Sequence, residues 1–401
     1  MKPTLVLVER NAHLPSGHHH GALIALARAH QPTVVIVPNG VTAETRAALV
    51  NAQAQVVDRP HGTSGRILTV AARATEAAAH IALLLFRARH WPKGLRRAPH
   101  QITALARCLT ESAAVRTGRY LAGPHPVTVL SAGEALHTTT GLLGGPHARY
   151  VHEINTTEDR MLRLLGALTR RGTDRVTLLA PTDQVRDELA SLFPQVPCWT
   201  RPFAVADPGD RINETERCVA RQEAGLKAAD RAVCLVGGWW PSKDLATIDA
   251  ALHRITRPLT VLVIGGPLDE QMLRRWRDLP HVRLQATHST ATQAQIRGVY
   301  AAADATVLAR HPGVGKESGL LADAVRLGVP LLVSDHDPGL SARLRGRDWA
   351  RSFPAGDASA LADRLDRLSS SLPRRPGPKA AQQIGIPTAA EQAAFLVCLP
   401  H

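Results

Sequence analysis

Short apolar runs alternate with helix-like patterns along nearly the whole chain, and this alternation constrains the fold more than any other feature. TLVLVE (4–9) precedes GALIALARAH (21–30), and PTVVIVP (32–38) precedes AETRAALVNA (43–52). Strands this apolar are buried on both faces, and the helices between them form the crossovers of a parallel sheet. Residues 1–200 are therefore predicted to form a doubly wound α/β domain.

The rhythm loosens at RPFAVADPGDRINETE (201–216), where prolines and acids replace the apolar runs, so we place a linker there. A second cycle of strands and helices predicts another Rossmann-like domain over 217–372. We expect the two sheets to face each other across a cleft, with ligands at the carboxyl ends of the strands. The tail, 373–401, is predicted to be a proline-rich loop and a helix that packs back towards the N-terminal domain.

Cysteine usage and the N-terminus favour a cytoplasmic protein. The five cysteines lie far apart without a CxxC pair, which indicates neither a zinc site nor a disulfide framework. The N-terminal MKPTLVLVERN enters a strand-like run without the apolar core of a signal peptide. The most apolar helical segment, AAAHIALLLFRARHW (77–91), is too short and too interrupted by His and Arg to span a bilayer. We expect it to be a buried or half-buried helix, and a helix on a membrane surface is the alternative.

The net charge of +14 raises nucleic acid as a partner, but aromatic residues make up only 3% of the chain and the arginines are scattered. We therefore expect no nucleic acid partner. The chain has only six lysines among its 48 basic residues. Two of them, Lys243 and Lys316, lie in glycine-rich loops, which indicates that a compact ammonium group is wanted there.

The loop GGWWPSKDLAT follows a predicted strand. Gly237 and Gly238 let the chain turn, Ser242 is predicted to cap the next helix, and Lys243 is predicted to lie in its first turn. A cation is unfavourable at a helix N-terminus unless an anion is bound there. A solvated lysine on an exposed helix face is the alternative.

A second loop, RHPGVGKESG, opens a helix at the start of LLADAVRLG. Helix N-termini attract phosphate, and glycine lets a ligand approach the main chain closely. Asp323, one turn into the helix, can accept both hydroxyls of a ribose. An ordinary loop between two elements is the alternative. The candidate residues of this loop are Lys316, Ser318, Gly319 and Leu320 for an anionic group, with Glu317 beside them.

Two loops in the N-terminal half also follow strands. In NAHLPSGHHHGALIAL, Gly17 opens a helix and His18 lies in a run of three histidines. Adjacent side chains on a helix do not share a face and no carboxylate accompanies them, so we expect no metal. His152 and Glu153 leave another strand together, where one can face a reacting hydroxyl and the other can hold a ligand. A histidine packed at a domain interface is the alternative.

The C-terminal motifs resemble those of the retaining GT-B glycosyltransferases, the group (family 4-like) that includes sucrose synthases and bacterial mannosyl- and N-acetylglucosaminyltransferases. LVGGWWPSKDLATIDAAL resembles that family's strand, arginine-containing loop, lysine and helix. The pair Ala303–Asp304 before a strand, and ADAVRLGVPLLVSD with Asp323, Gly328 and Pro330, are similar to two further family segments. The resemblance implies a site for a nucleotide-diphosphate sugar that requires no metal.

The chain departs from the family pattern at three positions. The family's arginine after the strand glycine falls on Gly238, and the first of two glutamates seven residues apart falls on Gly315. The second glutamate is shortened to Asp323. We expect Lys316 and Glu317 to compensate for these losses.

The resemblance implies a retaining transferase that moves a hexose or N-acetylhexosamine from a nucleotide-diphosphate sugar, UDP favoured, to a small polar hydroxylated acceptor, as in natural-product biosynthesis. No cofactor is expected. The predicted donor residues are Gly17, Gly237, Gly238, Lys243, Lys316, Glu317, Ser318, Gly319, Leu320 and Asp323; the predicted acceptor residues are His18, His152 and Glu153; and the predicted catalytic residues are His152, Lys243 and Glu317.

Three alternatives stay open. The basic and apolar segment LFRARHWPKGLRRA (85–98) favours a lipid-linked acceptor at an anionic membrane surface, although no long basic amphipathic helix is evident. A sugar-nucleotide epimerase or hydrolase can share the architecture. The missing arginine and glutamate favour a protein that binds nucleotide sugars without catalysis.

Overall fold

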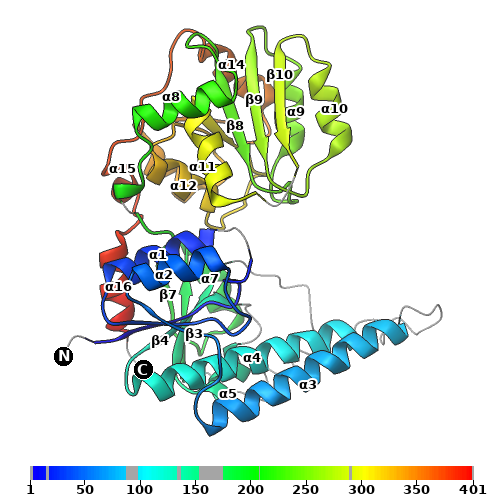
Figure 1. The fold of residues 1–401 in the computed structure, drawn as a ribbon. Helices are drawn as coiled ribbons and strands as arrows, with labels where there is room; N and C mark the ends of the chain where they lie inside the picture. Colours follow the sequence, from blue (N-terminus) through cyan, green and yellow to red (C-terminus); the bar gives the residue numbers. More distant parts are fainter. Residues whose placement is uncertain are drawn as a thin grey trace. The chain divides into compact units, whose positions relative to one another are not determined.

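The computed structural model divides the chain into two compact units (Figure 1). The first unit consists of Met1–Phe203 together with Ala389–His401, and the second is Ala204–Thr388. The C-terminal helix therefore belongs to the first unit. The structure describes residues 3–14, 18–86, 98–132, 137–152, 175–206, 208–288 and 291–399.

The first unit is built on a parallel seven-stranded sheet with the strand order β3-β2-β1-β4-β5-β6-β7. The central strands β1, β2 and β5 are buried along their whole length, as expected for strands covered on both faces. The chain reverses direction across the sheet between β1 and β4, which makes their carboxyl ends the switch point. The strands are β1 (Leu5–Val8), β2 (Thr33–Ile36), β3 (Gln55–Val57), β4 (Val127–Ala132), β5 (His147–Val151), β6 (Val176–Ala180) and β7 (Cys198–Thr200).

Two long helices, α3 and α4, pack side by side as a hairpin in the first unit (Figure 1). Helix α4 also packs on β1, β2 and β4, so one of the two helices is anchored on the sheet. The helices of this unit are α1 (His18–Ala29), α2 (Ala43–Asn51), α3 (Thr63–Phe86), α4 (Ala98–Ala122), α5 (His137–Gly144), α7 (Asp183–Leu192) and α16 (Ala389–Val397).

The second unit is built on a parallel six-stranded sheet with the order β10-β9-β8-β11-β12-β13. Alternate residues of one strand enter two cores: Cys234 and Val236 pack on one face, Val233 and Leu235 on the other. The switch point of this sheet lies between β8 and β11. The strands are β8 (Ala232–Val236), β9 (Leu259–Ile264), β10 (Val282–Thr287), β11 (Ala305–Leu308), β12 (Leu331–Ser334) and β13 (Ala350–Phe353).

The helices of the second unit cover both faces of its sheet (Figure 1). They are α8 (Glu214–Glu223), α9 (Leu245–Leu252), α10 (Glu270–Arg277), α11 (Gln293–Ala302), α12 (Gly319–Leu327), α13 (Pro338–Leu344), α14 (Ala358–Arg367) and α15 (Ala380–Gln383), with a short 3-10 helix at Pro208–Asp210.

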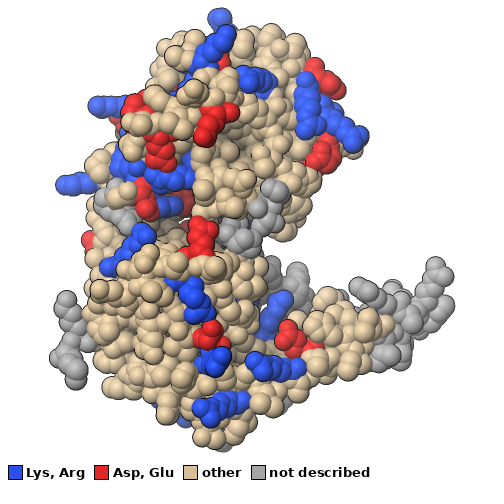
Figure 2. All heavy atoms as spheres, in the orientation of Figure 1, with Lys and Arg blue, Asp and Glu red and all other residues tan. Residues whose placement is uncertain are grey.

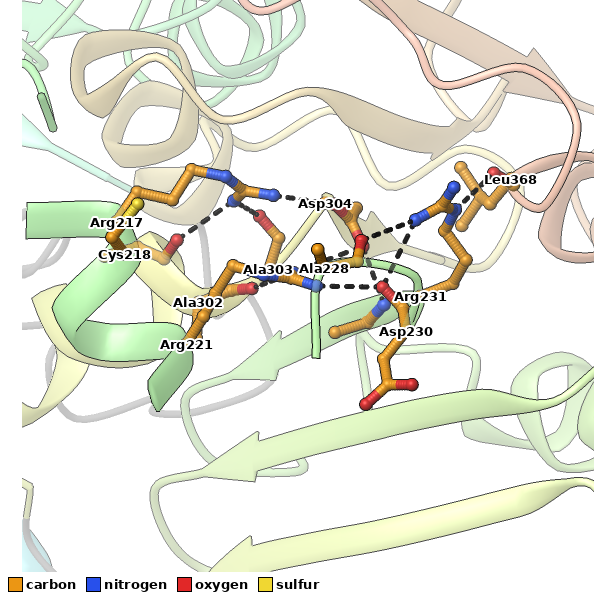
Figure 3. Close-up of polar contacts among 12 residues, drawn as sticks. Arg217, Cys218, Arg221, Ala228, Asp230, Arg231, Ala302, Ala303, Asp304 and Leu368 are labelled. Atoms are coloured by element: carbon orange, nitrogen blue, oxygen red, sulfur yellow. Dashed lines mark hydrogen bonds and ion pairs between the residues drawn. The ribbon is translucent and has the colours of Figure 1, made fainter. Parts of the chain in front are cut away.

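Asp304, which directly precedes β11, anchors α8 to the amino ends of β8 and β11 (Figure 3). Its carboxylate accepts hydrogen bonds from the guanidinium of Arg217 at 2.7 Å and from the main-chain N–H of Ala232 at 2.8 Å. Arg221 lies 3.6 Å away and donates to the carbonyl of Ala302. Asp304 therefore has a structural role at the end of the sheet opposite to the switch point.

Several local predictions differ from the structure. Helix α9 is capped by Asp244, whose carboxylate accepts from Thr247, so the predicted Ser242 cap is wrong. Lys243 consequently precedes the helix and does not lie in its first turn. Strands β7 and β13 and helix α13 were not predicted. The helix predicted near 158–170 lies outside the described residues.

Surface charge and apolar length add two observations. On the face drawn in Figure 2, basic side chains are interspersed with acidic ones. Among the described helices, α3 is long and apolar enough over Thr63–Leu84 to cross a membrane, by length and composition alone. Because the helix begins well before residue 77, its apolar stretch is longer than the segment judged from the sequence.

Candidate functional site

Two cations meet at the switch point of the second sheet. Lys243 lies in the loop after β8, and Arg310 lies two residues beyond the end of β11. Their main chains pair as an antiparallel β-bridge, although 67 positions separate them in the sequence. Ligands of open α/β sheets bind outside the carboxyl ends of the strands at such a point.

The ammonium group of Lys243 folds back onto the end of β8. Its Nζ donates hydrogen bonds to the carbonyl oxygens of Val236 at 2.8 Å and of Gly237 at 3.1 Å. Burial, and to a smaller extent the positive charge of Arg310, together lower the pKa of Lys243 to about 8. A bound anion would offset both effects, because it stabilises the charged form of the amine.

Arg310 is buried, and its guanidinium donates to the main-chain carbonyl of Lys316 at 2.8 Å. The main-chain N–H of Arg310 donates a hydrogen bond to Ser334 Oγ at 3.0 Å, which connects the end of β11 to β12. The arginine thus connects Lys243 with the glycine-rich loop before α12. Sequence analysis did not single it out, and its position directly after an apolar strand was the available signal.

Gly238 has no room for a side chain. A Cβ atom there would lie 2.3 Å from the carbonyl oxygen of Gly266, far inside van der Waals contact. A Cβ at Gly265 would likewise lie 2.8 Å from the main chain of Gly237. The turns after β8 and β9 therefore pack main chain against main chain, and no side chain fits at position 238.

The N-terminus of α12 completes this cluster. Ser318 caps the helix, and its Oγ accepts a hydrogen bond from the N–H of Leu321 at 3.3 Å. A Cβ built on Gly237 would lie 3.6 Å from Lys243 Nζ and 3.8 Å from a side-chain carbon of Leu320. The bare main chain of Gly237 therefore borders both the ammonium group and the side chain of Leu320, which lies in the first turn of the helix.

Glu317 and Asp323 point to other partners. Glu317 Oε1 accepts a hydrogen bond from the N–H of Ala204 at 3.3 Å. The half-buried Asp323 pairs with Arg326 one turn on at 3.1 Å, and Arg326 also pairs with Asp210. Burial raises the pKa of Asp323 against the opposing effect of Arg326. The structure therefore brings Lys243, Arg310 and the start of α12 together, with Asp323 on the same helix but held by a cation.

The switch point of the first sheet holds a buried carboxyl group that sequence analysis missed. Glu9 directly follows β1 and accepts hydrogen bonds from the N–H of Asn11 at 2.7 Å and from Ser131 Oγ at 2.9 Å. Burial raises its pKa to about 7. Nδ1 of His19 lies 3.2 Å from Ser131 Oγ and 3.9 Å from Glu9 Oε2.

His152 lies beside this group. Its Nε2 donates to the carbonyl of Leu130 at 2.8 Å, so that nitrogen carries a proton. The rings of His19 and His152 meet edge to face, with centroids 4.9 Å apart, and Phe203 packs against His152 at 4.5 Å. The first unit therefore gathers Glu9, His19 and His152 around the ends of β1, β4 and β5.

Other predicted residues of the first unit cannot be placed in this group. Gly17 and Glu153 lie outside the described residues, and His18 begins α1. His20 turns away to Thr45, with Nδ1 and Oγ1 2.9 Å apart. Within the described part of the chain, no group of three His, Cys, Asp or Glu side chains is arranged to hold a metal ion.

Solved structures of glycosyltransferases share this fold over nearly the whole chain. HepE of Anabaena, in complex with UDP and glucose, has a TM-score of 0.63 at 12% identity and covers 98% of this chain and 99% of its own. A glycosyltransferase from Rickettsia africae has a TM-score of 0.57 at 11% identity, with 99% and 93% covered. WaaG, a glycosyltransferase involved in lipopolysaccharide biosynthesis, has 0.53 at 14%, with 99% and 97% covered.

The chain matches no protein-family model, and it matches no curated protein in sequence. At these identities the structural likeness establishes the fold. The chain has the GT-B fold of two Rossmann-like domains, which confirms the predicted fold class.

Proposed function

We propose that this protein is a glycosyltransferase that takes its sugar from a nucleotide-diphosphate donor, UDP favoured. The similar structure of HepE was solved with UDP and glucose, and it extends over the whole chain. A general role in glycosyl transfer is the function that fits both the fold and the cluster at the second switch point.

One observation carries the proposal: two cations and a helix N-terminus meet at the switch point of the second sheet. Lys243 and Arg310 are bridged through their main chains, and Gly237 borders both Lys243 and the start of α12. A diphosphate is the ligand that suits two converging cations and first-turn N–H groups. The bare glycines at 237 and 238 would let it approach the main chain.

These groups would act mainly on the leaving diphosphate. Charge develops on its bridging oxygen as the bond to the sugar breaks, and fixed positive groups in a site of low dielectric stabilise that charge. We propose that Arg310 supplies the second cation on the diphosphate, in place of the arginine that the family carries at the position of Gly238. With two protein cations present, we propose that transfer proceeds without a metal ion.

Residues of α12 and its loop would bind the rest of the donor. Asp323 is proposed to accept hydrogen bonds from the ribose hydroxyls, with Arg326 opposing the rise in its pKa that burial causes. Glu317 is proposed to contact the sugar hydroxyls, which requires it to leave the N–H of Ala204. Lys316 is proposed to add a further cation near the diphosphate.

The first unit is proposed to bind the acceptor, a small polar hydroxylated molecule of the kind found in natural-product biosynthesis. His152 would contact the reacting hydroxyl, with His19 and Glu9 beside it. A carboxyl group with a pKa of about 7 can accept or release a proton near neutral pH. We further propose that transfer retains the configuration of the sugar's anomeric carbon, which NMR of the product would show.

Calorimetric titration with UDP-, GDP- and dTDP-sugars tests the proposal. We expect micromolar binding of one donor and a loss of about 10- to 100-fold in Lys243→Ala, as for a charged hydrogen bond. Lys227→Ala, an exposed lysine of the same unit, is the matched control and should bind like the wild type.

Two outcomes would change the proposal. If the wild type binds no nucleotide sugar in the panel, the second switch point is not a donor site. If a donor is bound and is converted without an added acceptor, the activity is that of an epimerase or a hydrolase. Addition of a chelator separates a metal-dependent reaction from the metal-free one proposed.

A further inference from the structure

Helix α3 carries an exposed apolar face that the proposed function does not use. The side chains of Ile67, Val70, Ile81 and Leu84 have exposed fractions of 63%, 69%, 58% and 67%. Single exposed apolar residues are ordinary on protein surfaces, but a contiguous set of large ones indicates an interaction site.

These residues lie on one stripe of the helix. Together with Ala74 and Ala77 they are spaced in alternating steps of three and four, which keeps them on one side over about 25 Å. The buried residues of α3 lie on the other side, where the helix packs on α4. We call the stripe the α3 apolar face; it consists of Ile67, Val70, Ala74, Ala77, Ile81 and Leu84.

One edge of the α3 apolar face is basic. Arg66, Arg73 and His80 are exposed and repeat every seven residues, so they form a row beside the stripe. The helix contains a single acid, Glu76. In sequence, the connection from α3 to α4 (87–97) has five Lys and Arg residues and no acid.

The charge pattern does not fit a second copy of this chain. In an antiparallel pair of α3 helices the two basic rows would face each other, and like charges repel. In a parallel pair each row would face Ala71 and Ala78, which offer no carboxylate. An anionic membrane surface complements the basic row, and the apolar interior beneath that surface accommodates the α3 apolar face.

The packing of α4 favours a helix that lies on a membrane over one that crosses it. The buried residues of α4 from Ala106 to Gly118 belong to the core of the first unit, since α4 packs on β1, β2 and β4. Crossing a bilayer would require α3 to separate from this anchored partner.

We propose that the α3 apolar face docks on an anionic lipid bilayer, with Arg66 and Arg73 at the level of the headgroups. Docking would place the enzyme beside membrane-borne molecules, so lipid-linked acceptors belong in any acceptor panel. The proposal does not depend on the proposed glycosyl transfer, because vesicle binding is measured without donor or acceptor.

Co-sedimentation with vesicles tests the docking. We expect the full chain to sediment with vesicles of phosphatidylglycerol and phosphatidylcholine in equal parts, and about tenfold less with phosphatidylcholine alone. The double variant Val70→Asp/Ile81→Asp should lose about tenfold or more in affinity for the anionic vesicles. Val219→Asp, at a 49% exposed valine on α8, is the matched control and should bind like the wild type.

A second variant tests the basic row by itself. Arg66→Glu/Arg73→Glu should also weaken binding to the anionic vesicles, whereas Arg345→Glu, at an exposed arginine after α13, should not. Both double variants change exposed residues, and circular dichroism verifies that they fold. Wild-type protein that binds neither vesicle, or either double variant that binds like the wild type, overturns the proposal. A dimer that Val70→Asp/Ile81→Asp dissociates without lipid would also overturn it, since a second copy would then cover the face.

Discussion

Arg310 and Lys243 are joined through an antiparallel β-bridge of their main chains at the switch point of the second sheet. The bridge holds two like charges near one another, and the proximity is one reason why the pKa of Lys243 is lowered. Like charges brought together by a fold, beside a helix N-terminus, are typical of a site whose anion balances them.

Replacement of Arg310 tests its assignment as the second cation. Arg310→Ala should weaken binding of the UDP-sugar by about 10- to 100-fold, because a charged hydrogen bond to the diphosphate is lost. Calorimetry measures the change, with Arg345→Ala as the control. Unchanged affinity in Arg310→Ala, in a protein that retains its melting temperature, would assign the diphosphate to other cations.

The lowered pKa of Lys243 predicts a proton linkage. Near pH 8.5 part of the free amine is neutral, and a bound diphosphate raises its pKa, so binding of UDP should take up a fraction of a proton. Titrations in buffers of different ionisation enthalpy measure this uptake. Near pH 6.5 the uptake by the lysine should vanish, because the free amine is already charged, and Lys243→Arg should abolish the uptake near pH 8.5. The same uptake in Lys243→Arg would assign the proton to another group.

Glu9 predicts a pH dependence of stability. Its pKa is about 7 in the folded protein against 4.5 for the free side chain, so the native state holds the proton more tightly. The stabilising contribution of Glu9 to the free energy of unfolding is therefore fully present below about pH 4.5 and is lost as the pH rises to about 7. Glu9→Gln should remove this pH-dependent decrease in the free energy of unfolding, which amounts to about 3 kcal/mol. Urea unfolding at pH 5 and about pH 8 measures it, and equal pH dependence in wild type and variant would contradict it.

Replacement of Asp304, which lies away from the proposed donor site, should lower the stability of the fold. Asp304→Asn removes the charge that pairs with Arg217 and leaves that guanidinium beside carbonyl groups, at a cost of about 3–5 kcal/mol. Asp348→Asn, in an exposed pair with Arg374, should cost less than about 1 kcal/mol. Urea unfolding of both variants compares them, and a cost at 304 no larger than that at 348 would show that the anchor is weak.

The central strands could be predicted because burial on both faces leaves a simple trace in the sequence. The residues of β8 and β9 are all buried, and all but Thr260 are apolar, so they were recognised as strands. Edge strands lack that trace. Strand β13 reads ARSF and β7 reads CWT, with polar or exposed positions that do not distinguish them from loops.

The candidate site was predicted in part. Lys243 and the start of α12 stood out because lysine and glycine are informative where arginine is the common cation. Arg310 and Glu9 did not, since an arginine or a glutamate at the end of a strand is ordinary until the sheet order shows which strand ends are neighbours. Because β8 and β9 are neighbours in the sheet, the turn after β9 fills the space that a side chain at position 238 would need.

A crystal structure of the protein with UDP is the most direct test of the central claim. We predict diphosphate oxygens within hydrogen-bond distance of Lys243 Nζ, the guanidinium of Arg310 and the first-turn N–H groups of α12, with Nζ released from the carbonyls of Val236 and Gly237. Density for UDP at another place, with Lys243 still bound to those carbonyls, would contradict the account.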